Sequence, residues 1–113
     1  MIEMSCHRDA VRFAVETAPD DVNDCNCSIC RRYGAFWAYY QRPQVRFEAD
    51  NGPTGTCVWR YRMLEFHRCR SCGCVPHWAA IDPAYERMGL NARLMPPDLL
   101  AQIPVRRFDG AST

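Results

Sequence analysis

The chain has 113 residues, the size of one small domain, and we expect residues 1–113 to fold as a single unit. Its 14 basic and 13 acidic residues give a formal net charge of +1, which predicts neither a nucleic acid nor an anionic membrane as a partner. No apolar run approaches the roughly 20 residues needed to span a bilayer. The N-terminus has neither the basic nor the apolar segment of a signal peptide, so we expect a cytoplasmic protein.

The order of apolar residues predicts a mainly β fold built from short strands. Val11, Phe13 and Val15 alternate with other residue types, and this period of two is typical of a strand. The predicted strands are residues 11–15, 36–40, 45–49, 56–62 and 64–69, with a turn over residues 51–55. Residues 97–103 suit one or two helical turns, with Asp98 near the N-terminus. The small and polar residues 109–113 are expected to fray.

Eight cysteines are the unusual feature of the composition. In a secreted chain they would indicate disulfides, whereas in a reducing cytosol thiols stay free unless a metal binds them. Because we expect no export signal, metal binding is the favoured interpretation.

The sharpest local pattern is Cys25-Asn26-Cys27-Ser28-Ile29-Cys30. In an extended chain, residues two apart point to the same side, so Cys25 and Cys27 can present two sulfurs to one ion. A tight turn over the next two residues would bring Cys30 in as a third ligand. Three clustered thiolates repel one another unless a cation holds them, and zinc is the usual cation for such ligands. We therefore predict zinc at this cluster, with buried structural cysteines as the alternative.

A second cluster is Cys69-Arg70-Ser71-Cys72-Gly73-Cys74. Cys-x-x-Cys-Gly is a zinc-knuckle pattern, because glycine permits a turn that points backbone N–H groups at the sulfurs. The same spacing also fits a thiol redox pair, although no βαβ context surrounds it. A knuckle needs ligands from elsewhere in the chain, and Cys6 is the natural one.

The remaining candidate residues are less specific. Cys57 stands alone in a strand pattern and is predicted to be a small core residue. Arg31 and Arg32 are either a solvated face or partners for nearby anions. Each of the three histidines is either an ordinary structural residue or a metal ligand, and the sequence does not distinguish the two: His7, His67 and His77.

Taken together, these motifs resemble the glutathione-dependent formaldehyde-activating enzyme family of centromere protein V-like proteins. Ser5-Cys6-His7 and the following Ala10-Val11-Arg12-Phe13 are similar to the family's opening Cys-x-Cys-Gly-x-Val-x-Phe. Residues 25–35 resemble its central motif almost residue for residue, and residues 67–73 resemble its closing knuckle. Residues 88–93 and 108–110 also look familial, so the likeness spans nearly the whole chain.

The resemblance implies one small zinc β-tent domain of short antiparallel sheets, a fold shared with small-GTPase accessory chaperones and methionine-R-sulfoxide reductases. It implies one or two zinc ions per chain. A structural zinc would be held by the opening and closing cysteines, here Cys6, Cys69 and Cys72. A catalytic zinc would be held by the central three cysteines with its fourth position open.

This sequence departs from the family at the opening pair. Arg8 stands where the family has its second cysteine, and Asp9 replaces the glycine. Arginine cannot ligate zinc, because it stays protonated and has no acceptor. The fourth ligand is therefore one of Cys74, His67, His77 and Asp9, or the site is empty, and the sequence does not decide among these.

Two functions follow as alternatives. The first is a zinc-dependent carbon–sulfur lyase, in which Cys25, Cys27 and Cys30 hold zinc and a thiol such as glutathione adds to an aldehyde. In this reading, Arg31 and Arg32 would orient the carboxylates of glutathione. The second is a non-enzymatic zinc module that docks a partner protein, favoured by Arg8 and by the many aromatic residues. Thiol redox chemistry at Cys72 and Cys74 is a third. The pattern sets no oligomeric state.

Overall fold

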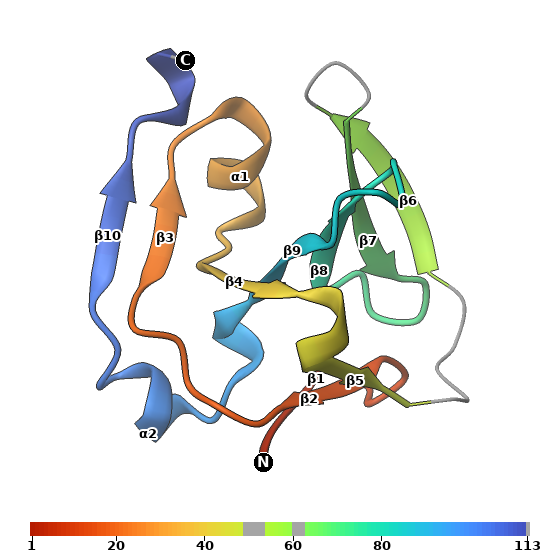
Figure 1. Ribbon diagram of the computed structural model, residues 1–113, viewed down its shortest axis with the longest axis vertical. Helices are drawn as coiled ribbons and strands as arrows, with labels where there is room; N and C mark the ends of the chain where they lie inside the picture. The colour runs from red at the N-terminus through yellow and green to blue at the C-terminus, as the bar shows by residue number, and fades with distance from the viewer. Residues whose placement is uncertain (49–53, 60–62, 113) are drawn as a thin grey trace.

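The protein is described here from a computed structural model, which defines residues 1–48, 54–59 and 63–112. Ten strands form two sheets within these residues, and the helices are short, so the predicted mainly β class is confirmed. The N-terminus and the C-terminus lie at opposite ends of the long axis (Figure 1).

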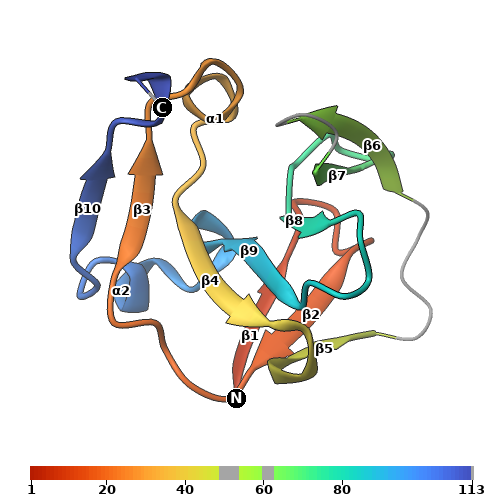
Figure 2. The ribbon, with the colours of Figure 1, turned by 45° about the horizontal axis from the view of Figure 1, so that its top comes forward.

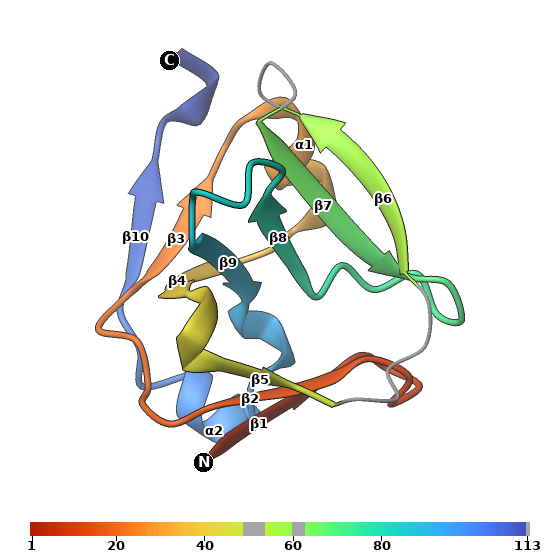
Figure 3. The ribbon, with the colours of Figure 1, turned by 45° about the vertical axis from the view of Figure 1, so that its right-hand side comes forward.

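The smaller sheet has three antiparallel strands in the order β1-β2-β5. The strands are β1 (Ile2–Ser5), β2 (Arg12–Val15) and β5 (Val45–Phe47). The predicted alternation is confirmed here, because Val11, Phe13 and Val15 are buried and Arg12 is exposed. Figure 3 shows this sheet at the end of the molecule where the chain begins, below the larger sheet.

The larger sheet has the order β10-β3-β4-β9-β8-β7-β6. Its strands are β3 (Val22–Cys25), β4 (Trp37–Gln41), β6 (Thr54–Trp59), β7 (Leu64–Cys69), β8 (His77–Ala80), β9 (Arg87–Asn91) and β10 (Val105–Phe108). All neighbours are antiparallel except β10 and β3, which run parallel. The sheet curves, so that β3 and β10 stand opposite β6 and β7 (Figure 2).

Short helical segments connect these strands. The α-helices are α1 (Ser28–Tyr33) and α2 (Pro97–Leu100), and the 3₁₀ turns are η1 (Arg42–Gln44), η2 (Ala92–Leu94) and η3 (Gly110–Ser112). The predicted helix at residues 97–103 is thus a single turn, with Asp98 in it as expected. No helix among the described residues is long and apolar enough to cross a membrane.

Strand β4 separates two buried clusters. Ala38 and Tyr40 face the main core between the two sheets, together with Val15 and Leu90. The alternate residue Trp37 faces a second cluster that includes the three central cysteines. Because side chains alternate along a strand, one aromatic segment supplies both the core and the wall of a site.

Some predicted boundaries shift in the structure. The strand predicted over residues 56–62 begins two residues earlier, because Thr54 and Gly55 pair with β7 rather than turning. The other turn residues, 51–53, and residues 49 and 60–62 lie outside the described part of the chain. The predicted strand at residues 64–69 is confirmed as β7.

The expectation of fraying is wrong for residues 109–112, and Thr113 lies outside the described part of the chain. The backbone N–H of Asn26 donates to the carbonyl of Phe108 at 3.2 Å, and its side chain also accepts from the N–H of Ala111 at 2.9 Å. These contacts connect segments more than 80 residues apart in the sequence, which local composition does not reveal.

Candidate metal and thiol site

The three central cysteines are brought together where β3 runs into α1. Cys25 ends β3, Cys27 is the extended residue that precedes the helix, and Cys30 lies inside it. Their sulfurs all lie within 4.8 Å of one another. The helix ends at Gly34, which has the left-handed φ of 65° that glycine adopts without strain. The structure therefore forms the turn that the spacing predicted, and it forms a group that could hold a metal ion.

Burial and the contacts among the three thiols disfavour the state in which all three carry a negative charge at once. Burial raises the pKa of Cys25 and of Cys30, and the thiol of Cys27 raises both further. The backbone N–H of Cys27 acts the other way on Cys25, and the indole of Trp37 acts the other way on Cys30. Burial also acts to raise the pKa of Cys27, but the N–H of Cys30 and the two other thiols outweigh it and lower that pKa. Of the three thiols, Cys27 alone has a lowered pKa, and a bound cation would favour the ionised form of all three.

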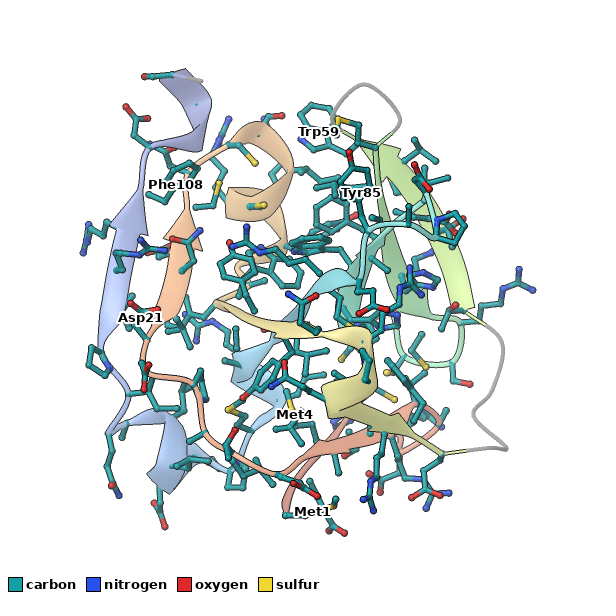
Figure 4. All side chains as sticks on the ribbon, viewed as in Figure 1. Met1, Met4, Asp21, Trp59, Tyr85 and Phe108 are labelled. Atoms are coloured by element: carbon teal, nitrogen blue, oxygen red, sulfur yellow. The ribbon has the colours of Figure 1, made fainter. Side chains whose placement is uncertain are left out.

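A small cavity of about 100 Å³ opens at these sulfurs. Its described lining is mostly aromatic: Asn23, Cys25, Cys27, Cys30, Trp37, Tyr39, Trp59, Leu64, Phe66, Trp78 and Phe108. Trp59 and Phe108 remain 36% and 41% exposed, so they form its outer rim. Figure 4 shows Phe108 on the β10 side and Trp59 on the β6 side of this end of the molecule.

Three residues that sequence reasoning missed lie beside the sulfurs and form hydrogen bonds there. The indole Nε1–H of Trp37 donates to Cys30 Sγ at 3.4 Å. The amide Nδ2 of Asn23 donates to the hydroxyl of Tyr39 at 2.7 Å, and burial raises the pKa of Tyr39. A signal was present, because Trp37 and Tyr39 alternate in a predicted strand and Asn23 precedes Cys25 by two residues.

The second cysteine group brings Cys6, near the start of the chain, to the Cys69–Cys72 pair, as the sequence predicted. The sulfurs of Cys6, Cys69 and Cys72 lie within 4.8 Å of one another, which again could hold a metal ion. The backbone N–H of Val11 donates to Cys6 Sγ at 3.4 Å. The backbone N–H of Cys74 lowers the pKa of Cys72 to about 6, with help from the N–H of Arg8. Arg8 therefore contributes its backbone here, as its side chain cannot ligate.

Among the fourth-ligand candidates, Cys74 has the most direct contact with this group. Its thiol interacts with that of Cys72 and with the charge of Cys6. The imidazole of His67 instead bonds the hydroxyl of Thr54 at 2.9 Å. The ring of His77 stacks on that of His67, with the centroids 4.4 Å apart. Asp9 is close to the group through its backbone N–H, which donates to the carbonyl of Cys6 at 3.0 Å, but its side chain is exposed.

Three other predicted residues lie on the surface. Arg31 and Arg32 are exposed on α1, and Arg32 donates to the carbonyl of Ser28 at 2.7 Å. Neither belongs to the described lining of the thiol cavity. The prediction that Cys57 is a core residue is wrong, because it is exposed on β6, where its sulfur interacts with the hydroxyl of Tyr33.

Comparison with known proteins gives a similar solved structure and a matching family. A solved structure of a Rhodobacter sphaeroides protein, determined as a structural-genomics target, is similar with a TM-score of 0.74 and 27% sequence identity. The match covers 92% of this chain and 99% of that one. No curated protein matches the sequence significantly. The family profile "Glutathione-dependent formaldehyde-activating enzyme" matches residues 1–97, and the chain therefore belongs to this family.

Proposed function

We propose that the protein is a zinc-dependent carbon–sulfur lyase of the glutathione-dependent formaldehyde-activating type. It would form or break S-hydroxymethylglutathione, or a related adduct of a small thiol and an aldehyde. The central observation is the group of three buried thiols, within 4.8 Å of one another, that opens onto an aromatic cavity. Membership of the family supports the choice of glutathione and formaldehyde as first substrates.

The donor set fits zinc. Cys25, Cys27 and Cys30 would hold the ion, since soft thiolates are its preferred ligands and three of them leave a fourth position for another ligand. When bound, zinc would favour the ionised form of a ligand thiol. The Nε1–H of Trp37 on Cys30 Sγ would orient this ligand, as hydrogen bonds around metal ligands commonly do.

The chain itself would hold the thiol and the aldehyde next to each other and keep water away. In adduct formation, the thiol sulfur forms a bond to the carbonyl carbon, and the electron pair of the C=O π bond moves to the oxygen. The proton lost by the thiol balances the new charge when the oxygen becomes a hydroxyl. Because the uncatalysed addition already proceeds, proximity in the cavity is the main expected contribution.

We also propose that residues 1–113 form one zinc-binding domain with a second, structural zinc. Cys6, Cys69 and Cys72 would supply three ligands, and Cys74 is the favoured fourth. The eight free cysteines suit a reducing compartment, so we place the protein in the cytoplasm.

Calorimetric titration of the zinc-loaded protein with glutathione tests the proposal. We expect binding at millimolar concentration or tighter, and faster exchange between formaldehyde and S-hydroxymethylglutathione by NMR. Binding should disappear in a Cys25→Ser, Cys27→Ser, Cys30→Ser variant. Absence of binding by the unmodified protein would contradict the enzyme proposal.

The alternative is a zinc module that docks a partner protein through the cavity rim. Exposed apolar side chains at this end favour it: Val58, Trp59, Met63 and Phe108. A protein that holds zinc but binds no thiol would favour this alternative.

A further inference from the structure

Two polar side chains in the thiol cavity have no part in the function proposed above. Tyr39 from β4 and Asn23 from β3 both line the cavity beside the three central cysteines. They bond each other, with the Asn23 amide nitrogen 2.7 Å from the Tyr39 hydroxyl oxygen. Polar groups in so aromatic a cavity are expected to fix the orientation of a ligand.

The ring of Tyr39 is held in place from two sides. The indole of Trp78 packs against it edge to face, with the ring centroids 6.0 Å apart. The guanidinium of Arg87 lies 4.2 Å from its centroid. Gly89 makes room for this packing, since a Cβ there would stand 2.1 Å from the indole nitrogen of Trp78. The phenol hydroxyl therefore has a defined position beside the sulfurs.

Tyr39 and Asn23 do not satisfy all of each other's hydrogen-bonding groups. The Tyr39 oxygen accepts from Asn23, so its own proton has no acceptor among the described residues. Asn23 is 4% exposed, and its Oδ1 has no partner in the same part of the chain. If the amide is turned over, the phenol donates to the amide oxygen, and the amide N–H groups are left over instead. The orientation in the structure leaves the Tyr39 proton for a further group, whereas the reversed one leaves the Asn23 amide protons. Buried polar groups normally have partners.

We propose that the hydroxyl of Tyr39 donates a hydrogen bond to the substrate oxygen, and that Asn23 positions this hydroxyl. The oxygen is the carbonyl of the aldehyde before addition and the hydroxyl of the thiol adduct afterwards. This inference rests on the function proposed above. It adds which residues bind the oxygen atom of the substrate.

The chemistry gives this donor a role in the reaction. As the C–S bond forms, the electron pair of the C=O bond moves to oxygen, and negative charge grows there. A positioned donor stabilises that charge more than it stabilises the neutral aldehyde, which lowers the barrier. The proton that ends on the oxygen balances the one lost from the thiol, so Tyr39 is unchanged after each turnover.

The neighbouring Tyr40 provides a matched control on the same strand. It faces the main core, and its hydroxyl donates to the carbonyl of Thr17 at 2.7 Å. Tyr39→Phe and Tyr40→Phe therefore each remove one hydroxyl from adjacent residues, and only the first lies in the thiol cavity.

The test compares kcat for adduct formation, zinc content and the Kd for glutathione in both variants. We expect Tyr39→Phe to lower kcat at least about tenfold while zinc content and the Kd stay within twofold. Tyr40→Phe should lower Tm but keep kcat. A Tyr39→Phe enzyme with unchanged kcat overturns the proposal, as does one that loses zinc or glutathione affinity in proportion to its rate.

Two further results separate this inference from the function on which it rests. If the unmodified protein neither binds glutathione nor speeds adduct formation, the proposed function fails and this inference fails with it. If the unmodified protein is active and Tyr39→Phe equals it, only the role of Tyr39 is overturned. Should Tyr39→Phe not fold, Asn23→Ser takes its place, with a fall in kcat expected and an unchanged kcat contradicting the proposal.

Discussion

The side-chain amide of Asn26 donates a 2.9 Å hydrogen bond to the carboxylate of Asp109, 83 residues further along the chain. This bond lowers the pKa of Asp109. Asn26 is the middle residue of the Cys25-Asn26-Cys27 motif, so the loop that presents two of the thiols also holds the C-terminal segment. Phe108 is thereby kept at the rim of the thiol cavity.

We predict that Asn26→Ala loosens the C-terminal segment. The variant loses both side-chain hydrogen bonds, to Asp109 and from Ala111, while the cysteines on either side stay in place. Amide hydrogen exchange in residues 105–112 should be about tenfold faster. Gln102→Ala is the control, because it removes one exposed bond to Asp98 in α2. Equal exchange in the two variants would show that Asn26 does not hold the segment.

The second prediction concerns metal content. Protein purified without chelator should contain at least one zinc per chain, because three thiols in contact are held together best by a cation. Changing Cys25, Cys27 and Cys30 together to serine should remove one zinc, as measured by elemental analysis. Changing the exposed Cys57 to serine should remove none. A triple variant that keeps all its zinc would refute the central assignment.

The third prediction concerns the fourth ligand of the second zinc site, where Arg8 stands in place of the family's cysteine. If Cys74 completes the second site, Cys74→Ser should lower zinc content or Tm, and Arg8→Cys should restore it in the double variant. Metal that binds only the folded state stabilises it by mass action, so both readouts should move together. Arg8→Cys alone should then change little. A large gain from Arg8→Cys in the unmodified background would instead show that the site lacks a fourth ligand.

Local spacing predicted the central cluster because its three cysteines lie within six residues, and one turn brings them together. The strand at residues 64–69 was also predictable, because its apolar residues alternate. Five strands were not predicted: β1, β3, β8, β9 and β10. Two of them escaped prediction for opposite reasons. Strand β8 is buried on both faces, and β10 is exposed along its whole length, so neither shows the alternation of a half-buried strand.

The residues around the thiols were harder to predict because they come from distant segments. Asn23 lies outside every predicted strand, and only the pairing of β3 with β4 brings it to Tyr39. Phe108 reaches the cavity through the parallel pairing of β10 with β3. Cys57 was misjudged because β6 is the edge strand of its sheet, and most of its side chains are exposed.

The fourth prediction concerns Arg31 and Arg32 as partners of the glutathione carboxylates. Because both are exposed, a charge pair there is worth less than a buried one. We expect Arg31→Ala and Arg32→Ala each to weaken glutathione binding about two- to fivefold, and less at high salt. Arg46→Ala is the control, since Arg46 pairs with Glu16 on the smaller sheet. If neither change exceeds that of the control, the arginines do not hold the ligand.

The fifth prediction is a loss of stability in acid caused by His77. Burial lowers the pKa of His77 to about 3, and the positive charges of His67 and Arg42 add to this effect. Phe13 and Phe47 also pack against the ring, and Glu65 lines the same cavity of about 400 Å³. The folded protein thus keeps His77 neutral at pH values where the unfolded chain, with a pKa of about 6.5, protonates it.

The sign of the effect follows from this difference in proton binding. Between pH 6.5 and about 3 the unfolded state binds the extra proton, so the free energy of unfolding falls as the pH falls. The limiting slope is about 1.4 kcal/mol per pH unit. His77→Phe removes this titration but leaves that of His67 and of the cysteines. Urea unfolding at pH 7 and pH 5 should therefore show a loss for the unmodified protein that exceeds the variant's by about 2 kcal/mol. Equal losses would mean that His77 is already protonated in the folded protein, and that its buried position does not exclude the charge.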